Sequence, residues 1–91
     1  MSEELLAQFE QAAADVTNLS EKPDSGDLLR LYAMYKQGKE GDCTGDRPGM
    51  LDFVKRAKFD AWKGLAGTSK DEAMQMYIDL VNELKSQDAT R

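Results

Sequence analysis

An apolar stripe with the period of an α-helix runs through the last third of the chain. It begins after Ser69-Lys70-Asp71-Glu72, a capping box in which the serine and the glutamate each satisfy a backbone donor at a helix start. Apolar residues then recur every three or four positions, at Ala73, Met76, Tyr77, Leu80, Val81 and Leu84. This pattern predicts a helix over residues 69–85, followed by a polar tail at 86–91 that we expect to be frayed.

Three more amphipathic segments precede this one. They cover residues 2–19, with Ser2 as a possible N-cap, residues 24–39, with Asp24 as N-cap, and residues 52–66. In the third of these segments we expect Phe53, Val54, Ala57, Ala61 and Leu65 to point inward. Residues 41–49 carry turn chemistry, and no segment has the period of a strand. The sequence therefore predicts an all-α, four-helix bundle, and 91 residues allow a single domain, 1–91.

Composition excludes several classes of function. Twelve basic against seventeen acidic residues give a net charge of −5, which disfavours a nucleic-acid binder because such affinity rests on neutralising phosphates. A single cysteine and no histidine rule out Cys/His metal sites and remove the commonest general base. We therefore expect no enzyme activity, no metal and no cofactor.

The amino-terminal residues are acidic and lack the layout of a secretory signal. The longest apolar run spans only residues 31–35, far short of a bilayer-spanning segment. We expect a cytoplasmic protein without stable membrane insertion.

The charge is unevenly distributed. Residues 30–63 hold eight basic and five acidic residues, a local charge of +3 against −8 for the rest of the chain. A basic centre in an acidic protein indicates a site for a compact anion. A mixed, solvated surface would give the same count and stays open as an alternative.

Tyr32, Tyr35 and Lys36 lie at positions i, i+3 and i+4, so they project from one side of the second helix. Two phenols and an ammonium offer ring faces for stacking and donors for a phosphate. Tyrosines at helical spacing also serve in cores, and this second interpretation stays open.

Five short blocks carry a more specific signal. They are LYAMYKQ at 31–37, GD at 41–42, RPGMLDF at 47–53, RAKFDAW at 56–62 and GTSK at 67–70. In this order and spacing they resemble the acyl-CoA-binding protein family, also called the diazepam-binding inhibitor family. The resemblance extends from Phe9 to about Lys85.

The resemblance implies an up-down-down-up bundle that binds one acyl-CoA between its helices. It assigns the ligand to Tyr32, Tyr35, Lys36, Lys58 and Tyr77. Lys36 and Lys58 would bind the 3′-phosphate of CoA with the Tyr32 hydroxyl, Tyr35 would pack against adenine, and Tyr77 would line the nucleotide and pantetheine region. Two further positions match contacts to the acyl chain, Leu28 and Leu29.

The chain departs from the family pattern at three places. Phe59 stands where many members have tryptophan, and Thr17 where many have a basic residue. A lysine that often follows the Asp-Phe pair is Val54 here, and Lys55 is displaced by one position, about 100° around the helix. Peripheral phosphate contacts, including any from Lys55, are the ones these changes affect.

From the residues and the resemblance together, we expect a monomeric carrier of long-chain acyl-CoA that binds its ligand reversibly without catalysis. The alternative from another class is a small helical protein-interaction module whose aromatic face docks a partner.

Overall fold

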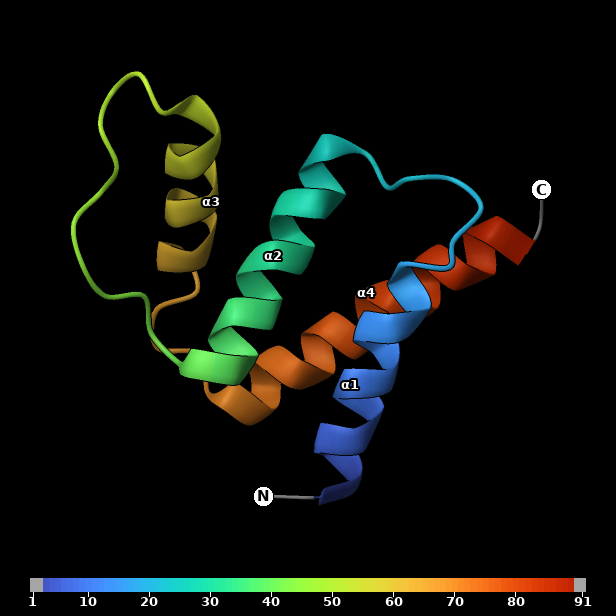
Figure 1. The fold of residues 1–91 in the computed structure, drawn as a ribbon. Helices are drawn as coiled ribbons and strands as arrows, with labels where there is room; N and C mark the ends of the chain where they lie inside the picture. The colour runs from blue at the N-terminus through green and yellow to red at the C-terminus, as the bar shows by residue number, and fades with distance from the viewer. Residues whose placement is uncertain (1–2, 90–91) are drawn as a thin grey trace.

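The computed structural model describes residues 3–89, which form four α-helices (Figure 1). They are α1 (Glu3–Val16), α2 (Ser25–Glu40), α3 (Phe53–Lys63) and α4 (Lys70–Ala89). The predicted capping box is present, since the Glu72 backbone N–H donates to Ser69 Oγ at 3.1 Å. At the start of α2, the Asp27 backbone N–H donates to Asp24 Oδ1 at 2.8 Å, as expected of an N-cap. The Ser2 cap lies outside the described residues.

Helices α1 and α4 rise in the view of Figure 1, whereas α2 and α3 both descend, so the up-down-down-up arrangement is confirmed. Two helices running in the same direction need a long connection, which residues 41–52 provide. Helix α4 packs on α1 and α2, and α3 packs on α2 alone among the described helices. Helix α3 therefore stands apart from the main core.

The core lies where α1, α2 and α4 meet. Phe9 and Val81 are fully buried there, together with most of the predicted α4 stripe. Gly38 of α2 lets α1 and α4 pack close to its backbone, because a Cβ at this position would lie 3.1 Å from both Phe9 and Met74. No helix within residues 3–89 is long and apolar enough to cross a bilayer.

Two expectations need correction. Phe53 and Val54 do not point inward: their side chains are 73% and 69% exposed, and α3 has no buried residue at all. The reason is that α3 meets only one neighbouring helix, which cannot cover its first turn.

The predicted fraying from residue 86 is also wrong over residues 86–89, because α4 continues to Ala89. The Asp88 carboxylate accepts a hydrogen bond from the Ser20 backbone N–H at 3.2 Å, which holds this last turn against the α1–α2 connection. Residues 90–91 lie outside the described part of the chain.

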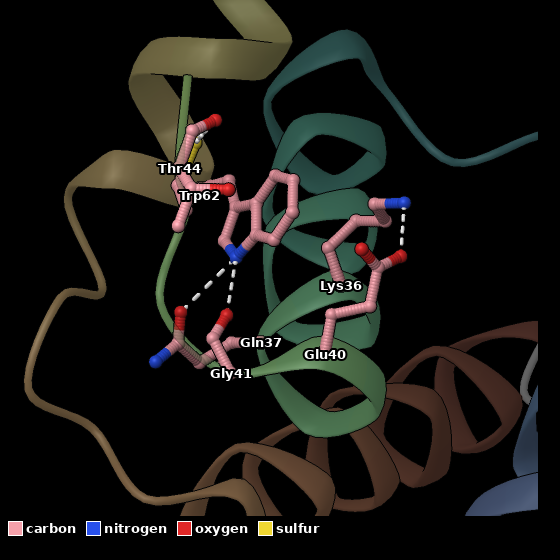
Figure 2. Close-up of polar contacts among 7 residues, drawn as sticks. Lys36, Gln37, Glu40, Gly41, Thr44 and Trp62 are labelled. Carbon is pink, nitrogen blue, oxygen red and sulfur yellow. Dashed lines mark hydrogen bonds and ion pairs between the residues drawn. The ribbon is translucent and has the colours of Figure 1, made fainter.

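A buried amide holds α3 in place. Gln37 of α2 is 0% exposed, and its Oε1 accepts a hydrogen bond from the Trp62 indole N–H at 3.1 Å (Figure 2). Its Nε2 donates to Asp42 Oδ1 and to the Thr68 carbonyl, both at 2.8 Å. Trp62 also donates to the Gly41 carbonyl at 2.9 Å. One side chain thus links α2, α3 and the loops at both ends of α3.

We expect Gln37→Ala to lower the free energy of unfolding by about 2 kcal/mol or more, because the indole and the other partners of the amide lose their bonds in a buried place. Urea unfolding followed by circular dichroism measures this. Gln75→Ala, at an exposed glutamine of α4, is the matched control and should change stability by less than about 1 kcal/mol. Equal losses in the two variants would contradict a special role for the buried amide.

Candidate functional site

A groove of about 650 Å³ opens between α2, the end of α1 and the segment that joins them. Four of the five primary site residues expected from the sequence line it: Tyr32 and Tyr35 from α2, Lys58 from α3 and Tyr77 from α4. Leu28, expected at the acyl chain, lines it as well. Tyr32 and Tyr77, which are 45 positions apart in the chain, therefore face the same groove.

Lys58 and Tyr32 meet at the centre of this site. The Lys58 ammonium lies 5.3 Å from the centroid of the Tyr32 ring, within the range of a cation–π contact. Among the residues that the structure describes, no carboxylate lies within ion-pair distance of Lys58. Its positive charge is thus available to an anion in the groove.

Tyr35 and Tyr77 belong to the wall of the groove and to the core together. Tyr35 stacks on Phe9 at 5.2 Å between ring centroids, and Tyr77 lies edge-on to the same ring at 5.2 Å. Tyr77 is 4% exposed, and this burial, with a smaller effect of Tyr35, raises the pKa of its phenol. A neutral hydroxyl on a ring held by packing can donate a hydrogen bond from a fixed position.

An apolar trough of about 360 Å³ continues the groove between the first turns of α2 and α3. Leu28 and Lys58 line both hollows, so the two are contiguous. Leu29, the second residue expected at the acyl chain, lies in the trough and not in the groove. The remaining lining side chains are mostly apolar: Phe53, Val54 and Ala57, with Ser25 at one end.

Lys36 does not line the groove. Its ammonium forms an ion pair with Glu40, one turn further along α2, and lies 5.0 Å from the centroid of the Trp62 ring (Figure 2). The hydrogen bond to Glu40 raises the pKa of Lys36, against a smaller opposing effect of desolvation. The structure therefore separates Lys36 from the four residues that it groups in the groove.

Lys55 lines a smaller hollow of about 260 Å³ on the other side of Lys58, together with Tyr32, Phe59 and Trp62. Its charge lies near the site without entering the main groove. Within the described part of the chain, no three Cys, Asp or Glu side chains come close enough to hold a metal ion.

Sequence reasoning missed two kinds of residue. Lys22, to which no role was assigned from the sequence, lines the groove together with Thr17, the position at which many members of the family have a basic residue. The available signal was a lysine directly before Pro23, between the first two predicted helices. Gln37 belongs to the block at 31–37, but its role does not follow from the sequence, because a polar residue inside an amphipathic helix gives no sign that it is buried.

Most of the chain is similar to known proteins. The family model described as acyl-CoA-binding protein matches residues 6–81. The acyl-CoA-binding protein homolog of Manduca sexta is 49% identical over 88% of this chain and 90% of its own length. The acyl-CoA-binding protein homolog 1 of Caenorhabditis elegans is 47% identical over 84% of this chain and 88% of its own length.

A solved structure agrees with these sequence matches. The crystal structure of Oryza sativa acyl-CoA-binding protein 2 superposes with a TM-score of 0.90 at 38% identity, covering 94% of this chain and 96% of that one. The family match, the two relatives and the shared four-helix fold lead to one conclusion: the chain belongs to the acyl-CoA-binding protein family.

Proposed function

We propose that this carrier of long-chain acyl-CoA esters holds its ligand along the groove and the trough, with the CoA head in the groove and the acyl tail between α2 and α3. As a member of its family the chain is a binding protein and not an enzyme. We further propose that residues 1–91 act as one domain, as a monomer in the cytoplasm. One observation supports this binding mode. Lys58 and Leu28 line both the groove, which is aromatic and basic, and the trough, which is apolar, so the two hollows are connected. An amphiphile with an anionic head and a long tail matches that sequence of surfaces.

The phosphate end of the ligand is assigned to Lys58 first. The Lys58 ammonium forms no ion pair with a described carboxylate and lies beside the ring of Tyr32. The Tyr32 hydroxyl can donate a second hydrogen bond to the phosphate. Lys36 would join them by leaving Glu40, a movement of a side chain that is only part-exposed. Lys22 also lines the groove and can add a further charge. Tyr35 and Tyr77 supply ring faces for the adenine and pantetheine regions.

The tail is assigned to the trough because each methylene removed from water contributes about 0.8 kcal/mol. Leu28 and Leu29 form one side of the trough, and Phe53, Val54 and Ala57 the other. Placing the tail there would also cover Phe53 and Val54, whose exposure the fold alone leaves without a purpose.

We expect Lys58→Ala to weaken palmitoyl-CoA binding by about 1.5–3 kcal/mol, the range for hydrogen bonds to a charged group. With 3′-dephospho-palmitoyl-CoA the loss should be much smaller, because the bond partner is gone. Calorimetry with both esters measures the difference, and Lys39→Ala, at an exposed lysine of α2, is the control. Equal losses with the two esters would mean that Lys58 does not bind that phosphate.

Glu40 offers a test of the role of Lys36. Glu40→Gln releases the Lys36 ammonium and removes a negative charge beside it, so palmitoyl-CoA affinity should rise up to about fivefold. The gain should vanish in the background of Lys36→Ala. Glu83→Gln, at an exposed carboxylate of α4, should leave affinity unchanged. A gain that persists without Lys36 would point to a general effect of net charge.

The length of the acyl chain tests the assignment of the tail. Affinity should rise from butyryl- to palmitoyl-CoA by up to about 0.8 kcal/mol per methylene, with a heat-capacity change that grows more negative. Leu29→Ser should flatten this rise while preserving discrimination against the dephospho ester. Calorimetry below the micelle concentrations of the esters measures both. A flat series in the wild-type protein would overturn the binding mode and leave a site for the nucleotide head.

A further inference from the structure

Four large apolar side chains crowd the start of α3 without any protein covering them. Met50 is 76% exposed, Leu51 88%, Phe53 73% and Val54 69%. We call residues 50–54 the apolar tip. Exposed apolar side chains are ordinary when scattered, but four within five residues form a patch. The acyl tail of the proposed function would cover Phe53 and Val54, and Met50 and Leu51 would still need a partner.

The apolar tip lies at the mouth of the trough. Phe53 and Val54 belong to the tip and also line the trough, whereas Met50 and Leu51 line neither the trough nor the groove. In Figure 1 the start of α3 lies at the top of the view, beside the start of α2 and away from α1. Whatever covers the tip therefore meets the open end of the trough.

The charges beside the tip favour an anionic partner. Residues 46–60 carry four basic and three acidic side chains, a local charge of +1, in a protein whose net charge is −5. Within this stretch Arg47 is paired with Asp60, whereas no ion pair with a described residue engages Lys55 or Lys58. Lys55 and Lys58 are exposed on the same helix. Basic residues beside an apolar surface add to its attraction for an anionic bilayer.

The shape of the tip separates a bilayer from a partner helix. A partner helix needs a groove to receive its apolar face, whereas these side chains project from a loop and a first helical turn. Such a projection can enter the deformable interface of a lipid layer.

We propose that the apolar tip is a docking surface for an anionic lipid bilayer, with Met50 and Leu51 inserted among the lipids and the mouth of the trough against the membrane. This inference rests on the proposed function, because docking would let an acyl tail pass between the bilayer and the trough without crossing water. The docking is peripheral and reversible, because only a few side chains enter the lipid.

Vesicle sedimentation tests the proposal directly. The wild-type protein should partition onto phosphatidylcholine vesicles that contain phosphatidylserine, and less onto phosphatidylcholine alone. Leu51→Ser should lower partitioning by about tenfold, since a leucine side chain no longer leaves water. Met50→Ser should act in the same direction. Leu6→Ser, at a partly exposed leucine of α1, is the matched control and should partition like the wild type.

Acyl-CoA binding in the absence of vesicles separates this proposal from the proposed function. Leu51→Ser should keep the wild-type affinity for palmitoyl-CoA, because Leu51 lines neither hollow. A wild-type protein that stays off the vesicles, or a Leu51→Ser variant that binds them equally well, overturns the docking surface. Failure of palmitoyl-CoA binding with intact vesicle binding would instead overturn the proposed function.

Discussion

The position of α3 depends on one buried amide. The helix has no buried residue and meets only α2 among the described helices, so apolar burial contributes little to its orientation. Gln37 supplies what burial does not, by accepting from Trp62 and donating to Asp42 and Thr68. Because an unsatisfied polar group in this place is costly, the network holds a single arrangement. Asp42 is strengthened in its role by the Gly67 backbone N–H, whose hydrogen bond lowers the pKa of that carboxyl.

The geometry of the candidate site depends on this position of α3. Lys58 and Trp62 lie one turn apart on α3, so the bond that orients the indole also brings Lys58 to Tyr32. The trough has Leu28 and Leu29 on one side and α3 on the other, and its width follows from the same angle between helices. In the binding mode that we propose, the acyl tail lies between α2 and α3. Polar contacts that hold α3 leave this space free, whereas apolar side chains packed between the two helices would fill it.

Side chains of the site differ in how firmly they are held. Tyr35 and Tyr77 pack on Phe9, so their rings are part of the core and the groove has a rigid wall there. Lys36 and Lys58 are long and part-exposed or exposed, and both lie over aromatic rings. Rigid rings with adjustable cations suit a ligand whose flat base needs a fixed surface and whose phosphates can be met from several directions.

The sequence by itself determined what depends on neighbours within about one helical turn. The caps at Asp24 and Ser69 and the apolar stripe of α4 appear where the pattern predicts them, since both rest on contacts between residues three or four apart. The family resemblance then identified the side chains that line the groove. Only the tertiary structure decided that Phe53 and Val54 at the start of α3 are exposed, that α4 continues to Ala89, and that Gln37 is buried. It also brought Lys22 to the groove, whereas the pairing of Lys36 with Glu40 is a local contact one turn apart on α2. The tertiary outcomes are of another kind. These outcomes depend on contacts between segments far apart in the chain, and no local period encodes which segment arrives beside which.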